Sequence, residues 1–146
     1  MKAGSKIDLN FRAVKKVAAQ LQKLGCENVT VVYGGGRSMP LIYVGHLRLI
    51  VRVAKMCGTL RTVTVGGKKY SYPYSCWVFN LHHKGEKIEG VDGVFCVLYR
   101  KREFYCVPFS EIQGSNICIH KSTRRKQYGG RHAQFRNSVR WLLEAA

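Results

Sequence analysis

The residues in this sequence that could do chemistry are mostly cations, and two long stretches hold them without any acid. Lys and Arg number 25 against 8 Asp and Glu, so the 146-residue chain has a formal net charge of +17. No Asp or Glu occurs within residues 28–85 or within residues 112–143. A surface of one sign attracts polyanions, and the phosphates that bind there release counterions. The charge pattern therefore favours nucleic acid as the partner, either DNA or RNA.

Ten basic residues of these stretches are the candidates for nucleic-acid contact. We expect those of the first stretch on one face and those of the second on a flanking arm. Most would contact phosphates, which position a protein without reading sequence. Tyrosines among the first group could stack on bases, although ordinary sheet packing would also place them there. The candidates are Arg37, Arg52, Lys55, Arg61, Lys68, Lys69, Arg124, Arg125, Lys126 and Arg131.

The six cysteines and five histidines show no spacing typical of a metal site. No Cys-x-x-Cys pair occurs, which argues against a zinc ribbon or finger. Cys96 and Cys106 could face each other across a hairpin, although two small half-buried residues are the plainer interpretation. Asn80 and His82 share one face of a predicted strand, a pattern also compatible with polar residues at a strand end. We therefore expect no bound metal and reduced thiols.

Neither a membrane span nor an export signal is recognisable. No apolar run approaches the roughly 18 residues that a spanning helix needs. The chain does not open with a charged segment followed by an apolar one. We expect an intracellular protein, cytoplasmic or nucleoid-associated, without membrane contact. The length fits a single domain over residues 1–146 with its own hydrophobic core.

Hydrophobic spacing predicts the elements that must position the basic side chains. Apolar residues three and four apart predict a first helix, which Asp8 or Asn10 could cap. β-branched runs and glycine turns predict short strands and hairpins, one of them with Gly66 and Gly67 at its tip. Together these elements predict one α+β domain. In chain order they are a helix over 11–24, strands over 28–33, 41–44, 48–54, 62–65, 68–72, 75–81, 93–99, 103–107 and 116–120, and a closing helix over 131–144.

The order of these elements is similar to that of a nuclease family. The similar segments are the first helix, Gly34 to Gly36, Leu41 to Val44, Val51 to Ala54, Phe79 to Leu81, Val91-Asp92, Phe104 to Pro108 with Ser110 and Glu111, and Arg131 to Leu143 with Trp141. In this order they resemble the PD-(D/E)XK superfamily, and within it the small homing endonucleases of group I introns. The resemblance implies a restriction-endonuclease-like core, in which helices from both ends of the chain flank a mixed β-sheet. One difference is the absence of a clear helix between Ala54 and Gly93.

The resemblance also implies where a catalytic site would lie. The family holds Mg²⁺ with an Asp at the start of one strand and a Glu on the next, two residues before a Lys. Those positions fall at Pro40 and at Ile50 and Arg52, and a register shifted by three reaches Lys55 but still no acid. Pro and Ile cannot bind Mg²⁺, and a nearby Arg would repel it. The resemblance therefore implies a DNA-binding protein with a degenerate nuclease site and no cofactor.

Two alternatives stay open at this point. The protein could be an active Mg²⁺-dependent endonuclease with relocated ligands, for which Asp8, Lys55, Asp92 and Glu111 are the candidates. It could instead be an RNA-binding component of a ribonucleoprotein, which its charge and size fit equally well. Because homing-type relatives reach long sites as dimers or tetramers, a homo-oligomer is compatible with any of these functions.

Overall fold

A computed structural model describes residues 6–33, 40–83, 85–112, 114–122, 127–128 and 130–145. These residues form two α-helices, two short 3₁₀ helices and eleven strands. The bounds are α1 Lys6–Lys23, β1 Val29–Val32, β2 Leu41–Val44, β3 Leu47–Ala54, β4 Cys57–Val65, β5 Lys68–Asn80, β6 His82–His83, β7 Glu86–Lys87, β8 Gly93–Leu98, β9 Phe104–Pro108, η1 Phe109–Glu111, β10 Asn116–Ser122, β11 Gln127–Tyr128, η2 Gly130–Phe135 and α2 Arg140–Ala145. The predicted α+β class, with helices at both ends, is confirmed.

A five-stranded mixed sheet forms the centre of the molecule, in the order β1-β2-β3-β8-β9. The first three strands are an antiparallel meander, because short connections join strands that alternate in direction. β8 then runs parallel to β3, from Leu49 opposite Gly93 to Ala54 opposite Leu98. β9 returns antiparallel to β8 and completes the sheet.

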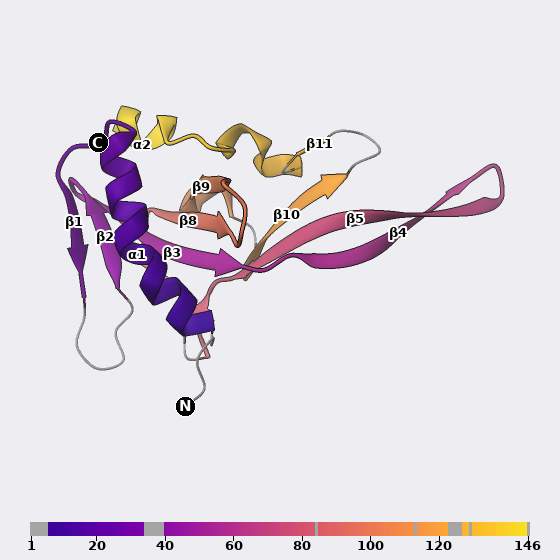
Figure 1. The fold of residues 1–146 in the computed structure, drawn as a ribbon, viewed down its shortest axis with the longest axis horizontal. Coiled ribbons are helices and arrows are strands. Elements are labelled where there is room, and N and C mark those ends of the chain that lie inside the picture. The colour runs from indigo at the N-terminus through magenta and orange to yellow at the C-terminus, as the bar shows by residue number, and fades with distance from the viewer. Residues whose placement is uncertain are drawn as a thin grey trace.

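Helices cover one face of this sheet (Figure 1). The stripe Val14, Val17 and Leu21 of α1 is buried against Leu49 and Val51 of β3, as the helical spacing predicts. The helix begins earlier than expected, so Asp8 and Asn10 lie inside it and do not cap it. Asn10 has another role, because its Oδ1 accepts a hydrogen bond of 2.7 Å from the backbone N–H of Val53.

A second, antiparallel sheet covers the opposite face, in the order β11-β10-β5-β4. Trp77 and Phe79 of β5 form a core with Ile50 of β3 and with Ile117 and Ile119 of β10. The connection from β3 to β8 is therefore made by strands and loops. In the described part of residues 55–92 it contains no helix, as the sequence predicted.

The β4–β5 hairpin projects away from the two sheets (Figure 1). We call its residues 58–73 the arm, because β10 pairs with β5 only from Tyr74 onward. The hairpin is longer than the sequence predicted. Gly66 and Gly67 form its tip with φ of 59° and 81°, a two-residue turn that residues with side chains rarely adopt.

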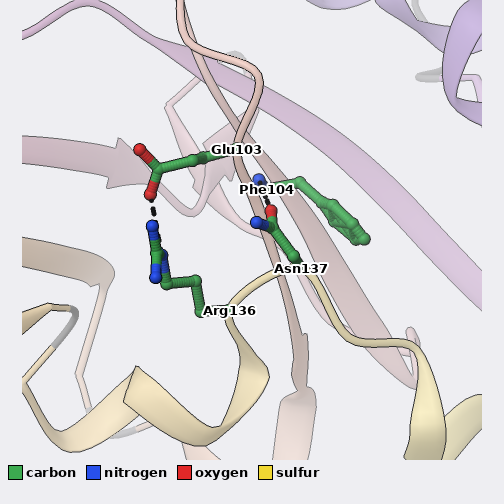
Figure 2. Close-up of polar contacts among 4 residues, drawn as sticks. All are labelled: Glu103, Phe104, Arg136 and Asn137. Carbon is green, nitrogen blue, oxygen red and sulfur yellow. Dashed lines mark hydrogen bonds and ion pairs between the residues drawn. The ribbon is translucent and has the colours of Figure 1, made fainter.

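The predicted closing helix is wrong in its first half. In place of one helix over 131–144, η2 ends at Phe135, and α2 begins only at Arg140. Asn137 interrupts the predicted helix, because its φ of 51° is left-handed and not helical. In this conformation Asn137 forms hydrogen bonds with the edge strand β9 (Figure 2). The N–H of Phe104 donates to Asn137 Oδ1 at 3.0 Å, and the N–H of Asn137 donates back to the Phe104 carbonyl at 2.7 Å. Arg136 Nε adds a 3.0 Å ion pair with Glu103 Oε2.

Cys96 and Cys106 do not face each other, so the less favoured of the two interpretations is wrong, and both residues are fully buried and not half-buried. Cys96 is opposite Tyr105, and Cys106 is opposite Phe95, one residue away from the expected register. A shift of one residue turns a side chain to the other face of a sheet. Cys96 accordingly lies in the core between the sheets, and Cys106 in the core beneath the helices. None of the described helices is long and apolar enough to cross a membrane.

Candidate nucleic-acid interface

The positions that the family resemblance assigns to metal-binding carboxylates lie in or beside the protein interior. Pro40 directly precedes β2 and is half-buried. Ile50 is fully buried on the face of β3 that the second sheet covers. Within the described side chains, no group of three or more His, Cys, Asp or Glu is arranged to hold a metal ion.

Arg52 is also internal, which corrects its expected place on an exposed face. Only 7% of Arg52 is exposed, and its Nη2 donates a 3.3 Å hydrogen bond to the carbonyl of His82. Burial lowers the pKa of the Arg52 guanidinium from its usual value, while the nearby Cys96 thiol opposes this effect. Arg52 therefore links β3 to the start of β6 and is not available as a surface contact for phosphate.

The candidate acids for a relocated site are divided between the two ends of β3. At the amino end, Asp92 Oδ2 accepts a 2.8 Å hydrogen bond from the N–H of Arg48. The N–H of Asp92 donates a hydrogen bond of 2.8 Å to the carbonyl of Arg48. Glu111 belongs to the same end, because η1 begins at Phe109, whose N–H donates to the Asp92 carbonyl. Lys55 lies seven residues further along the strand, a distance of about 23 Å. Asp92 and Glu111 are therefore not part of a site around Lys55.

Asp8 is the remaining candidate acid. Its backbone lies in the first turns of α1, two residues before Asn10, whose side chain holds the end of β3 at Val53. This places the Asp8 backbone at the same end of the sheet as Lys55. The side chain of Asp8 lies outside the described part of the chain.

Asn80 and His82 do meet, as their predicted common face implies. Asn80 Oδ1 accepts a 2.9 Å hydrogen bond from the N–H of His82 and lies 2.9 Å from Nδ1 of its ring. Because the His82 carbonyl also holds Arg52, this pair fixes the turn between β5 and β6. These contacts fit the interpretation that Asn80 and His82 are polar residues at a strand end.

The arm presents two exposed faces that differ in chemistry. Direct partners in an antiparallel pair lie on the same face, and the faces alternate along the strand. Val65, Lys68 and Tyr70 therefore share one face, with 63% of Val65 and 47% of Tyr70 exposed. Thr64 and Lys69 share the other, where the hydroxyls of Thr62 and Ser71 are 3.0 Å apart. Lys68 and Lys69 are both exposed, but they lie on opposite faces of the arm, so the expectation of one shared basic face is wrong for this pair.

A second basic group lies where β3 and β8 end. Parallel strands end at the same edge, and the N–H of Tyr99 donates to the Ala54 carbonyl at 2.9 Å. Lys55 Nζ lies 5.4 Å from the centre of the Tyr99 ring, and Arg100 Cζ lies 5.5 Å from it. We call Lys55, Tyr99 and Arg100 the edge cluster. Glu103, close by in sequence, pairs with Arg136, and no ion pair to Lys55 or Arg100 occurs among the described residues.

The sequence reasoning missed Tyr99 and Arg100. The signal that could have found them is the Arg100-Lys101-Arg102 run at a hairpin tip, combined with a parallel pairing of β3 and β8. The remaining candidates stay predictions, because their side chains lie outside the described part of the chain. They are Arg37, Arg61, Arg124, Arg125, Lys126 and Arg131.

Comparison of the sequence with protein-family models and with curated proteins gives no match. Among solved structures, the chain is similar to a bacterial homing endonuclease, I-Ssp6803I. The TM-score is 0.58, with 16% sequence identity, over 96% of this chain and 90% of that one. At this identity the similarity concerns the fold. The chain therefore has an α+β fold of the homing-endonuclease kind, with an exposed basic arm and a basic edge cluster.

Proposed function

We propose that this protein binds nucleic acid, preferentially DNA, on a PD-(D/E)XK-type core whose metal-binding carboxylates have been lost. The observation that carries the proposal is the arm. It stands away from the body, it contains no acidic residue, and its tip carries the exposed pair Lys68 and Lys69. DNA is favoured over RNA because the fold is similar to that of a homing endonuclease.

The dimensions of the arm suit a groove of duplex DNA. A two-stranded β-ribbon fits the B-DNA major groove, which is about 12 Å wide. The eight residues from Gly58 to Val65 would span about 26 Å at the usual rise per residue. Lysines near the tip would then reach phosphates, and Tyr70 would offer a ring beside them. The edge cluster would hold a further phosphate.

Loss of the nuclease site is supported by what replaces its residues. A hard divalent cation requires oxygen ligands, and a fully buried Ile50 supplies none. Arg52 already engages the His82 carbonyl, so it does not take the place of the catalytic Lys either. We accordingly propose no metal cofactor. The homo-oligomer and the intracellular location stay predictions of the sequence.

The test is binding to a labelled DNA duplex over a range of salt concentrations. We expect the logarithm of affinity to fall steeply with the logarithm of salt concentration. The double variant Lys68→Gln/Lys69→Gln should weaken binding to all sequences alike and reduce the salt slope by about 2. Lys15→Gln/Lys16→Gln, with the same charge change on exposed positions of α1, should change binding less. No binding of the unaltered protein at low salt would overturn the proposal.

An active endonuclease is the second candidate, and the position of the Asp8 backbone near the end of β3 favours it. The discriminating measurement is incubation of supercoiled plasmid with the protein and Mg²⁺. Under our proposal the plasmid is retarded but stays intact. Cleavage that a chelator and Asp8→Asn abolish, but Asp92→Asn does not, would establish relocated ligands. Displacement of DNA by a smaller amount of RNA would instead favour a ribonucleoprotein component.

A further inference from the structure

Three cysteines gather on the outer face of the second sheet, where the arm joins the body. Cys76 of β5 is directly opposite Cys57 of β4. On its other side, Cys76 is opposite His120 of β10, and Cys118 is opposite Val78. Cys76 and Cys118 are therefore diagonal neighbours on one face. Their Sγ atoms lie 3.0 Å apart.

This distance is short for a diagonal pair. Directly opposed residues are normally closer than diagonal ones, but strand twist brings one diagonal together. A disulfide bond is about 2.0 Å long, so the two sulfurs need to approach each other by only about 1 Å. Cys57 is the direct neighbour by register, but the described thiol contact of Cys76 is with Cys118.

We propose that Cys76 and Cys118 form a site of reversible oxidative modification, at which hydrogen peroxide converts the two thiols into one intrachain disulfide. The proposal depends on the position of the sulfur atoms and not on nucleic-acid binding. None of the six cysteines is in a disulfide in this structure.

The two sulfurs differ in access, which sets the order of the steps. Cys118 is partly exposed, so peroxide reaches it first. Its sulfur takes one peroxide oxygen, becoming a sulfenic acid, and one water is released. Cys76 sulfur then attacks the Cys118 sulfur, the S–O bond breaks, and a second water leaves. In total two thiols lose two protons and two electrons, and one hydrogen peroxide is reduced to two waters.

Cys76 suits the second step because its sulfur already contacts that of Cys118, although Cys76 itself is shielded from solvent. Only 6% of this residue is exposed. Burial raises the pKa of the Cys76 thiol to about 12, helped by the hydrogen bond with Cys118 and by Cys57. It therefore remains a protonated thiol at neutral pH, and in the second step its proton leaves with the sulfenic oxygen as water. Contact with the oxidised Cys118 sulfur, and not a ready thiolate, is what favours this step.

The disulfide would tie the root of the arm to the body. β4 pairs with β5 as far as Cys76, and β10 pairs with β5 from Tyr74 onward. Cys76 therefore lies where the arm's ribbon becomes part of the second sheet. The two cysteines are 42 residues apart in sequence, so the cross-link also restricts the unfolded chain. We expect the oxidised protein to unfold at a higher temperature.

The experiment is titration of the full chain with hydrogen peroxide, followed by thiol counting and peptide mapping without reductant. We expect free thiols to fall from the six of the sequence to four, with a mass loss of two hydrogens. One cross-linked peptide should join Cys76 to Cys118. A dithiol reductant should restore all six thiols and the original unfolding temperature.

Variants separate this pair from its neighbour. Cys118→Ser, a change at a partly exposed position, should abolish the cross-link, whereas Cys57→Ser should leave it intact. Mapping of the unaltered protein stands on its own if a variant fails to fold. A Cys57–Cys76 bond, a cross-link between chains, or oxygen addition without any cross-link would each overturn the proposal.

Discussion

At the residue scale, the positions that the sequence resemblance assigned to catalysis, Ile50 and Arg52, are part of the core. Arg52, Cys96 and Tyr105 are opposite one another on three neighbouring strands, so they form a row across the central sheet. All three are buried beneath the second sheet, beside Ile50. Apolar packing closes this face of the central sheet, and Arg52 Nη2 donates a hydrogen bond to the His82 carbonyl.

Gly93 shows how tightly the other face of the central sheet, beneath the helices, is packed. A Cβ atom at Gly93 would lie 2.7 Å from two ring carbons of Trp141 and 3.0 Å from Leu49. The Trp141 ring cannot move freely, since its Nε1 donates a 2.9 Å hydrogen bond to the Cys106 carbonyl. We expect Gly93→Ala to lower the free energy of unfolding by about 1–3 kcal/mol.

Urea unfolding, followed by circular dichroism, measures this loss. Gly58→Ala is the matched control, because a Cβ there meets nothing within 4 Å. The control should change the unfolding free energy by less than about 0.5 kcal/mol. Equal effects of the two substitutions would contradict the packing argument.

The sequence predicted part of this site, and the limit has a physical reason. That Pro40 and Ile50 cannot hold a metal ion follows from residue type alone, because neither side chain carries a suitable oxygen. The burial of Arg52 could not be predicted in this way, because it depends on a second sheet whose strands come from residues far along the chain. Tyr99 and Arg100 were missed for the same reason, as the pairing of β3 with β8 is long-range.

At the element scale, the C-terminal segment protects the edge of the central sheet. β9 is the last strand of that sheet, and an uncovered edge offers unpaired N–H and C=O groups to other chains. Asn137 covers it with one side-chain and one backbone hydrogen bond to Phe104, as Figure 2 shows for the side chain. The apolar pattern of residues 131–144 predicted one continuous helix, because hydrophobic periodicity contains no information about these two hydrogen bonds. We call the pair of hydrogen bonds between Asn137 and Phe104 the clamp.

Replacement of Asn137 tests the clamp. We expect Asn137→Ala to cost about 2 kcal/mol, since it removes an acceptor and places Ala at a left-handed φ. Asn137→Gly keeps the backbone free and should cost about half as much. Thermal and urea unfolding measure both. Arg140→Ala, which breaks only the exposed pair with Glu144, should change stability by less than about 0.5 kcal/mol.

The edge cluster, where β3 and β8 end, could provide a second phosphate contact in addition to the arm. Lys55 and Arg100 lie against one ring and have no acidic partner among the described residues, so a phosphate between them would relieve their repulsion. We expect Lys55→Gln/Arg100→Gln to weaken DNA binding and to reduce the salt slope by about 2. Tyr99→Phe should keep the ring and the affinity. Binding isotherms identical to those of the unaltered protein would remove the cluster from the interface.

At the scale of the whole molecule, two cores share one central sheet, and both bury thiols. Cys96 lies between the two sheets, and Cys106 lies beneath the helices. Burial raises the pKa of both thiols well above the usual 9.0. Burial also raises the pKa of Tyr105 to about 12, with a contribution from Glu103. The folded protein therefore keeps protons that the unfolded chain gives up.

Stability should consequently fall in alkaline solution. Below about pH 8 the thiols are protonated in both states and add no slope. Between about pH 8 and pH 10 the unfolded chain loses their protons while the folded one does not, so unfolding becomes easier by about 1 kcal/mol for each buried thiol. Urea midpoints under reducing conditions across this range measure the slope. Cys96→Ala should make the decrease of stability with pH less steep, whereas Cys57→Ser, at an exposed position, should leave it unchanged. Equal slopes for the unaltered protein and Cys96→Ala would show that this thiol loses its proton alike in both states.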